Sequence, residues 1–250
     1  KASTEKLENL VKRSDFLKCK KIIPFASFIF FSNKENFYLN DSINTPMKVK
    51  KYFSNSSTKT FFMKPFEKQL VKNLKQSDES LKYWEDKFKN IKDYIPVGYE
   101  KSFSIEQLKE EFKLYKKKLI NKNNNIILNF LLLLKPFNIF SDIRIKIFDL
   151  DRIINYSLRT GITTINTDEF EVSLHSNSLM FIFKNEFGFD TLTVNGNFDC
   201  NKNGFSKMVK SFAIGSLNAM GLGLSFSAIL KPRLFLLLLS KLVRVENNLE

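Results

Sequence analysis

The pattern of apolar and polar residues predicts a helix, a strand and a loop at the start of the chain. Leu7, Leu10 and Val11 have the spacing of one helix face, and a run of β-branched and aromatic residues follows over 22–31. A short apolar run of this composition is typical of a buried strand. The next segment, 35–46, is dense in Asn, Asp and Ser, whose side chains bond the nearby backbone and favour turns.

Two amphipathic helices are predicted in the following part of the chain. In the first, Ser77 is a candidate N-cap, and apolar residues recur every three or four positions. These residues are Leu81, Trp84, Phe88 and Ile91. In the second, after a turn near 96–98, Ser104 and Gln107 have the spacing of a capping box, in which each side chain satisfies an end amide. Its apolar stripe consists of Ile105, Leu108, Phe112, Tyr115 and Leu119.

Beyond about residue 141 the apolar period changes from helical to two, which predicts strands. The strand-like runs are 143–147, 153–158, 170–174, 179–183 and 191–194. Asn195, Gly196 and Asn197 tolerate positive φ and are predicted to turn a hairpin. The other predicted elements are an apolar helix end or strand at 129–134, a short helix at 204–212, a small-residue loop at 215–223 and a C-terminal helix at 233–243. The second half is therefore predicted to be a mainly antiparallel sheet with a C-terminal helix.

Composition narrows the classes of partner. The chain has 250 residues, of which 43% are hydrophobic, so it can bury the core of one large domain or two smaller ones. A net charge of +14 brings nucleic acid and anionic membrane surfaces into consideration. Lysines alternate with acidic residues over 48–92 and 101–122, and Arg is scarce, so nucleic acid binding is not expected. The apolar runs 129–134 and 234–239 are far shorter than the ~20 residues that span a bilayer, so no transmembrane segment is predicted.

The sequence contains no set of residues that forms a catalytic or metal site by itself. His175 is the only histidine, which excludes a multi-histidine zinc site, and we interpret it as a polar residue in a turn at a strand end. Acid pairs such as Asp149 and Asp151 have a spacing too common to indicate a cation site. Cys19 and Cys200 lack the spacing of metal ligands, which favours a reduced, cytoplasmic protein. We therefore assign no catalytic residue, metal ligand or cofactor to this chain.

One segment resembles a known family. The run Ile22-Ile23-Pro24-Phe25-Ala26-Ser27-Phe28, followed by Asn36-Phe37-Tyr38-Leu39-Asn40 and by Asn44, resembles the late segment of metallo-β-lactamase-fold proteins in the branch that includes CMP-N-acetylneuraminate hydroxylase. In other branches a strand with a metal-binding histidine occupies this place, and Ala26 stands where that histidine would be. The earlier His-x-His-x-Asp-His cluster of the fold is missing. A second segment, 187–198, is similar to the tail of bacterial members of the group.

The resemblance implies a mixed α+β chain in three parts: the end of an α/β/β/α sandwich domain over 1–60, a helical linker over 61–140 and an α+β accessory domain over 141–248. It implies the non-catalytic C-terminal portion of a metal-dependent hydrolase acting on an unidentified small molecule. Zinc or iron would be held by a missing N-terminal half, unless the protein has no such site. Ser27, Asn36, Asn40 and Asn44 are then expected at the rim of the active site, with local turn hydrogen bonding as the alternative.

A different class of function is also open. The strands from Ile143 onward, with the segment 170–174 and the Asn195-Gly196-Asn197 turn, resemble sterol-carrier-type lipid-binding domains, which have an apolar tunnel. This resemblance implies a non-enzymatic module that binds an apolar ligand or a protein partner. A homo-oligomer through the leucine-rich C-terminal helix is one form of such a partner.

Overall fold

The computed structural model describes residues 2–25, 28–99, 101–133 and 140–225. The chain forms two compact units, unit 1 over Lys1–Gly98 and unit 2 over Tyr99–Glu250. The division thus falls at Gly98, whereas the sequence placed boundaries at 60 and 140. The predicted class is confirmed, because helices and a mixed five-stranded sheet make this an α+β protein.

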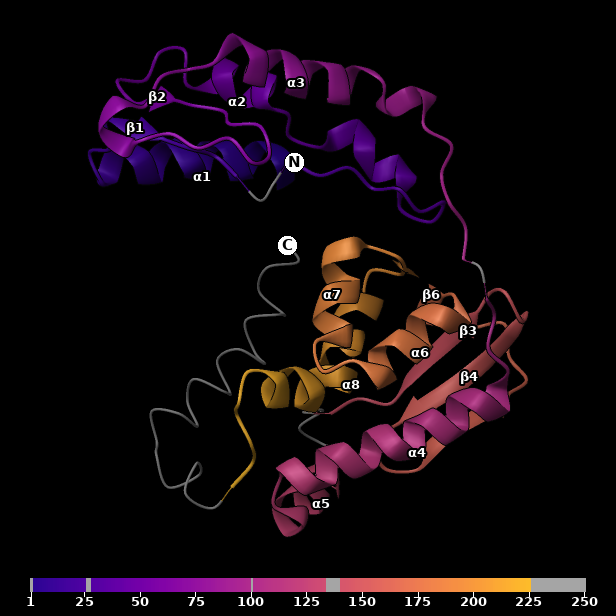
Figure 1. The fold of residues 1–250 in the computed structure, drawn as a ribbon. Helices are drawn as coiled ribbons and strands as arrows, with labels where there is room; N and C mark the ends of the chain where they lie inside the picture. The colour runs from indigo at the N-terminus through magenta and orange to yellow at the C-terminus, as the bar shows by residue number, and fades with distance from the viewer. Residues whose placement is uncertain (1, 26–27, 100, 134–139, 226–250) are drawn as a thin grey trace. The chain divides into compact units, whose positions relative to one another are not determined.

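Unit 1 consists of helices and short 3-10 turns around a two-stranded parallel sheet (Figure 1). Its elements are α1 (Ala2–Phe16), β1 (Lys21–Ile22), η1 (Phe37–Ser42), α2 (Pro46–Tyr52), β2 (Lys59–Thr60), η2 (Val71–Asn73), α3 (Asp78–Lys89) and η3 (Ile91–Asp93). The predicted helix start at Ser77 is confirmed, since its side chain accepts a hydrogen bond from the Ser80 N–H. The core contains Leu7, Val49, Phe53 and Phe62.

Among the described residues of 22–31, the predicted buried strand is confirmed at Ile22 alone and is wrong at 23–25 and 28–31. β1 ends at Ile22, and the described residues 28–31 form no strand. A strand needs a partner for its backbone amides along its length, and β2 provides only two residues. The Asn40 side chain takes that place at Phe31, accepting from its N–H and donating to its carbonyl oxygen, each at 2.8 Å.

The end of α1 is a left-handed turn at Lys18. The Lys18 N–H donates to the Asp15 carbonyl oxygen at 3.0 Å, and the Cys19 N–H donates to the Ser14 carbonyl oxygen at 2.9 Å. This pair of bonds defines a Schellman motif, whose left-handed position is usually glycine. Lys18 occupies that position with φ 51°. The turn directs the chain from α1 into β1.

Unit 2 is a five-stranded sheet in the order β5-β4-β3-β6-β7, with helices on one face (Figure 1). Its strands are β3 (Ile143–Ile147), β4 (Arg152–Ser157), β5 (Gly161–Ile165), β6 (Val172–Leu174) and β7 (Asp199–Cys200). Its helices are α4 (Ile105–Lys122), α5 (Asn125–Leu133), α6 (Ser176–Lys184), α7 (Gly188–Asn195) and α8 (Gly204–Ala219). β3 and β6 are parallel, and the other paired strands are antiparallel, as the prediction of a mainly antiparallel sheet requires.

The alternation of β3 fixes the buried face of this sheet. Its three isoleucines are buried, whereas Arg144 and Lys146 point to the other face and are half-exposed. On the buried face a group of aromatic rings joins the sheet to α4, α6 and α8, which follows from their apolar stripes. These rings are Phe112, Tyr115, Tyr156, Phe183, Phe189 and Phe212. The predicted capping box of Ser104 and Gln107 at the start of α4 is confirmed.

Two predicted strands are helices. The segments 179–183 and 191–194 lie in α6 and α7, and in α6 the buried residues Leu179, Ile182 and Phe183 follow the helical period. Short apolar runs fit both a buried strand and a helix, so the sequence alone did not separate them. The predicted hairpin turn is also wrong, because Gly196 ends α7 with φ 66°.

Three further predictions concern the helices that flank the sheet. The segment 129–134 is helical up to Leu133, within α5. The predicted helix at 204–212 is confirmed and extends to Ala219, so the predicted loop at 215–223 is helical in its first part. The predicted C-terminal helix at 233–243 lies outside the described residues. Over the ranges described, no helix has the length and apolar character needed to cross a membrane.

Candidate functional site

The three predicted rim residues that the structure describes lie in unit 1, and Ser27 lies outside the described residues. The Asn40 amide group bonds the Phe31 backbone and donates to the Phe37 carbonyl oxygen at 2.8 Å. The Asn36 side chain accepts from the Asn33 N–H at 3.2 Å. Each amide therefore holds the loop after the family-like segment in one conformation, and a role at an active-site rim stays a prediction.

Asn44 connects the same loop to α1. Its side chain accepts a hydrogen bond from the Ser3 hydroxyl at 2.5 Å and donates to the Ser3 carbonyl oxygen at 2.9 Å. Asn44 also lines a groove of about 510 Å³ between α1 and the segment that carries the family resemblance. The apolar side chains along this groove include Leu10, Ile23 and Phe25. Asn44 is thus a predicted rim residue that lies against a cavity together with that segment.

His175 lies directly after β6 and caps the first turn of α6. Its Nδ1 accepts a hydrogen bond from the Asn177 N–H at 3.0 Å, and its Nε2 lies 3.5 Å from Asp149 Oδ2. Its ring stacks on Tyr99, with ring centroids 4.2 Å apart. Since Nδ1 already accepts from the backbone, His175 lacks a free basic nitrogen for a nucleophile. The geometry agrees with our interpretation of a polar residue in a turn at a strand end.

Asp149 and Ser176 complete this cluster. The Ser176 hydroxyl donates to Asp149 Oδ2 at 2.6 Å, and the Ser176 N–H donates to Asp149 Oδ1 at 2.8 Å. Burial acts to raise the pKa of Asp149, but the hydrogen bonds from Ser176 outweigh it and hold that pKa below its usual value. The serine proton is therefore directed to a carboxylate rather than to His175, so the three residues do not form a nucleophile triad.

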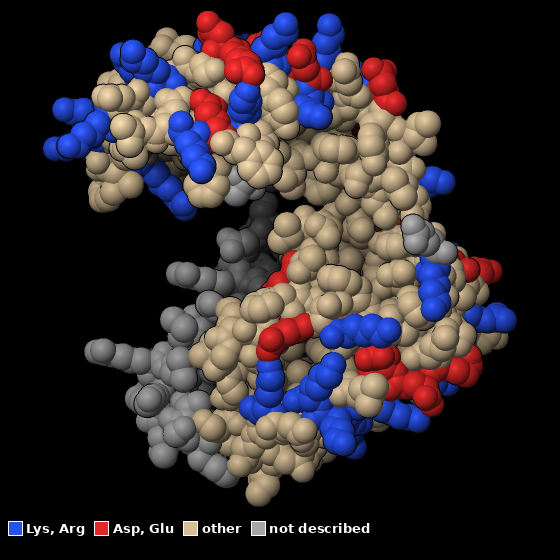
Figure 2. Space-filling model, in the orientation of Figure 1, with Lys and Arg blue, Asp and Glu red and all other residues tan. Residues whose placement is uncertain are grey.

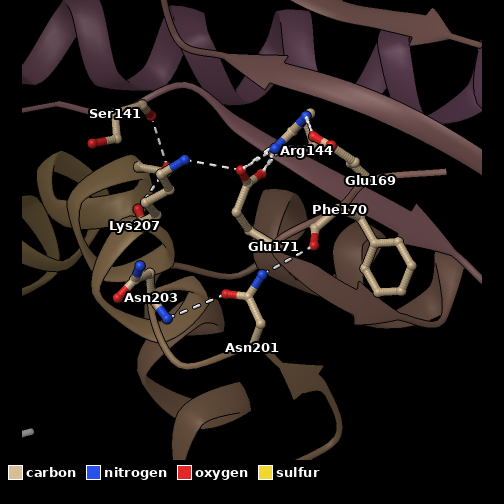
Figure 3. Close-up of polar contacts among 9 residues, drawn as sticks. Ser141, Arg144, Glu169, Phe170, Glu171, Asn201, Asn203 and Lys207 are labelled. Atoms are coloured by element: carbon tan, nitrogen blue, oxygen red, sulfur yellow. Dashed lines mark hydrogen bonds and ion pairs between the residues drawn. The ribbon is translucent and has the colours of Figure 1, made fainter. Parts of the chain in front are cut away.

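A charged cluster that the sequence did not reveal surrounds Glu171, directly before β6 (Figure 3). Glu171 is buried and accepts hydrogen bonds at 2.8 Å each from the Arg144 N–H, from Arg144 Nη2 and from Lys207 Nζ of α8. Burial acts to raise the pKa of Glu171, but these donors hold it at about 2. The cluster joins β3, β6 and α8. With every carboxylate oxygen engaged by a donor, it has the character of a structural ion pair.

A small pocket of about 240 Å³ lies in unit 2 between α4, α6 and α8. Leu119 and Phe183 give it an apolar wall, and Lys118 and Lys184 also line it. Tyr115 lines it as well, is only 7% exposed, and carries a phenolic hydroxyl. Burial raises the pKa of this hydroxyl, so it is a neutral donor at physiological pH.

The Tyr156 hydroxyl lies deeper in the same core. It is fully buried and has no hydrogen-bond partner within the described ranges, and burial raises its pKa well above the usual value. The Tyr156 ring packs against Phe183 and Phe212, with ring centroids 6.1 and 4.7 Å apart. The Tyr156 hydroxyl therefore lies within the apolar core, whereas Tyr115 is a phenol that lines the pocket.

Removing the Tyr156 hydroxyl is expected to stabilise unit 2. A buried polar group without a partner loses its hydration and gains nothing in return, so Tyr156→Phe should raise the free energy of unfolding by about 1 kcal/mol. Urea unfolding followed by circular dichroism measures this change. A loss of stability in the variant would contradict the unpartnered position of the hydroxyl.

The described residues do not fit a metal site. No group of three or more His, Cys, Asp and Glu side chains in the described part of the chain is placed to hold a metal ion. Cys19 and Cys200 are both free thiols. Burial raises the pKa of Cys200, which makes its thiolate less available as a ligand.

The fold and these clusters define the class of the protein as an α+β chain with a one-sided sheet in unit 2. Comparison with known proteins adds no family to this description. No family model, no curated protein and no solved structure matches the chain.

Proposed function

We propose that unit 1 is the terminal part of a metallo-β-lactamase-fold domain and that this chain is the non-catalytic portion of a metal-dependent hydrolase. In this proposal zinc or iron is held by residues that precede Lys1, and unit 2 is an accessory domain that shapes access to the metal. The family-like sequence of 22–28 and the Asn-rich loop after it support the proposal. The described residues form no group that could hold a metal ion, so the proposal places the metal ligands in the part of the protein that precedes Lys1.

One observation carries the proposal. After β1 the chain continues with large apolar side chains that unit 1 leaves exposed, and these are Ile23, Phe25, Ile29 and Phe30. Phe25 is 80% exposed. A run of exposed apolar side chains marks a surface that another part of a protein can cover. Ile23 and Phe25 belong to the segment that carries the family resemblance, and Ile29 and Phe30 follow it directly.

The test compares this chain with a chain extended by the residues that its gene encodes before Lys1. The extended chain is expected to retain stoichiometric zinc or iron after dialysis, and the present chain is not, as measured by elemental analysis. Metal bound with equal stoichiometry by the present chain would contradict the proposal. A gene without coding sequence for a metal-bearing half would contradict it as well.

A substitution in the exposed segment tests the same idea through stability. Phe25→Ser should change the free energy of unfolding of the present chain by less than about 0.5 kcal/mol, since the side chain is exposed. In the extended chain the loss should reach about 2 kcal/mol, because the added half buries the ring. Fluorescence of Trp84, the only tryptophan, follows unit 1. Ile95→Ser is the matched control, since Ile95 is 84% exposed and outside the segment.

A second candidate function is an apolar-ligand-binding module in unit 2, and the Tyr115 pocket favours it. Ligand sites combine an apolar wall with a few polar groups, and in this pocket Tyr115, Lys118 and Lys184 supply the polar part. Native mass spectrometry of the purified chain should show a co-purified small apolar molecule that is lost in Leu119→Lys. A ligand-free wild type that also fails to bind short-chain fatty acids would contradict this function.

A further inference from the structure

The end of unit 1 where α1 passes into β1 carries a concentration of positive charge. Of the ten residues 12–21, five are Lys or Arg, and only Asp15 is acidic. Figure 2 shows Lys and Arg side chains gathered at this end of unit 1. We define the basic end as Arg13, Lys18, Lys20, Lys21 and Lys59, all of which are exposed.

The fold assembles the basic end from two separate segments. The Thr58 hydroxyl donates to the Cys19 carbonyl oxygen at 2.7 Å, and the Lys59 N–H donates to the Lys20 carbonyl oxygen at 3.0 Å. In the parallel register of β1 and β2, Lys59 lies beside Lys21. Like charges are thus held side by side by backbone bonds, an arrangement that costs free energy unless an anionic partner neutralises it.

These cations have no acidic partners in the described part of the chain. None of the five lies within 4.0 Å of a carboxylate oxygen there. The Lys21 ammonium group lies 5.5 Å from the centre of the Phe61 ring and 3.5 Å from the Leu74 carbonyl oxygen. Neither contact neutralises its charge. Elsewhere in unit 1, Lys64 pairs with Glu79, so paired lysines do occur in the same unit.

Two large apolar side chains project from the middle of the basic end. Phe16 is 85% exposed and Leu17 is 67% exposed; Phe16 is the last residue of α1, and Leu17 lies between it and the left-handed position at Lys18. The unit 1 core includes neither residue. An aromatic and an aliphatic side chain with Arg13 before them and Lys18 and Lys20 after them along the chain have the composition of a surface that enters the boundary between lipid headgroups and acyl chains.

We propose that the basic end of unit 1 docks on the surface of an anionic lipid bilayer, with Phe16 and Leu17 inserted between the headgroups. The cations meet lipid phosphates, and the two apolar side chains leave water, so the two contributions add. A nucleic acid would neutralise the same cations, but Leu17 has no π-face to stack on a base, and Lys outnumbers Arg four to one in the basic end. Charge complementarity together with an aliphatic tip therefore favours the bilayer.

The experiment is co-sedimentation of the whole chain with vesicles of phosphatidylcholine alone or mixed equally with phosphatidylglycerol, in about 50 mM salt. Binding is expected for the mixed vesicles only. The double variant Phe16→Ser/Leu17→Ser should weaken binding about ten-fold, because it removes the inserted apolar area. Lys18→Gln/Lys20→Gln should weaken it about twenty-fold, and salt of about 500 mM should have a similar effect.

A matched control distinguishes binding through this site from non-specific hydrophobic binding to vesicles. Leu114→Ser/Ile126→Ser removes two exposed apolar side chains of unit 2 and should leave binding unchanged. Thermal unfolding checks that every variant is folded. Equal sedimentation with both kinds of vesicle overturns the proposal, as does unchanged binding of Phe16→Ser/Leu17→Ser. The proposal is also overturned if the chain binds duplex DNA more tightly than the mixed vesicles and that binding depends on Phe16, Leu17, Lys18 and Lys20. In that case the partner is a nucleic acid.

Discussion

Gly204→Ala is expected to destabilise unit 2 by about 3 kcal/mol, the upper part of the usual range for an overpacked core. A Cβ atom at Gly204 would lie 2.1 Å from the Glu171 carbonyl oxygen and 3.0 Å from the Glu171 carbonyl carbon. The obstacle is backbone rather than a flexible side chain, so α8 must move away from the start of β6. That movement also stretches the contact between Lys207 and Glu171.

The measurement is urea unfolding with two probes. Circular dichroism reports both units, whereas the fluorescence of Trp84 reports unit 1 alone. In Gly204→Ala the unit 2 transition should shift to lower urea, and the Trp84 transition should stay in place. Gly98→Ala is the control, since the nearest atoms to its Cβ belong to the flexible Lys34 side chain at 3.8 Å. A Gly204→Ala variant as stable as wild type would contradict the close approach of α8 to β6.

Glu171→Gln is the second change with a large expected effect. It should lower the free energy of unfolding of unit 2 by about 3 kcal/mol. The buried carboxylate accepts from Arg144 and Lys207, and a neutral amide offers them one acceptor oxygen instead of two charged ones. The estimate follows from the pKa of Glu171, which is about 2 in the folded chain and 4.5 for a glutamate in the unfolded chain. Chemical unfolding at neutral pH measures it.

The same group predicts the pH dependence of stability. The folded pKa of Glu171 is below its unfolded value, so its contribution is fully present above pH 4.5 and is lost as the pH falls from 4.5 towards 2. Wild-type unit 2 should therefore lose stability over this interval, and Glu171→Gln should lose about 3 kcal/mol less. Unfolding curves at a series of pH values measure the difference.

Glu169→Gln provides the matched control for Glu171. Glu169 also pairs with Arg144, at 2.7 Å, but its side chain is 77% exposed, so water screens the interaction. Its replacement should change the free energy of unfolding by less than about 1 kcal/mol. If both variants lost the same stability, burial would not be the source of the strength of the Glu171 contacts.

The sequence predicted those elements whose signals are local. The sequence signal for each of the Ser77 and Ser104 caps lies within four consecutive residues, and the alternation of buried and half-exposed residues in β3 lies within five. Each cap reflects hydrogen bonds within its own helix, and the alternation reflects the burial of one face of a single strand. The class of fold followed from these elements.

The wrong predictions concern segments whose secondary structure depends on the distant segment that they pack against or pair with. The run after Ile22 has strand composition, but no strand of unit 1 accompanies it, and Asn40 pairs with its backbone instead. The run 179–183 has strand composition too, yet it packs as a helix against α4. Pairing between distant segments leaves no trace in a single short run.

The candidate sites show the same limit. Asn36, Asn40 and Asn44 were recognised as polar loop residues, and the structure gives each a local backbone or helix contact. The Glu171 cluster was missed because its members come from three elements and each lies in an ordinary sequence context. A buried glutamate one position before an apolar strand was the only available signal, and it is a weak one.

The parallel pairing of β3 with β6 has a consequence for the order of folding. β3, β4 and β5 are neighbours along the chain and can pair as they emerge, since each contact closes a short loop. β6 must then reach past β4 and β5 to join β3, and the Arg144–Glu171 contact that marks this step closes an interval of 27 residues. The central strand of unit 2 therefore keeps one open edge until β6 arrives, and during synthesis that edge is the part of the sheet most exposed to pairing with another chain.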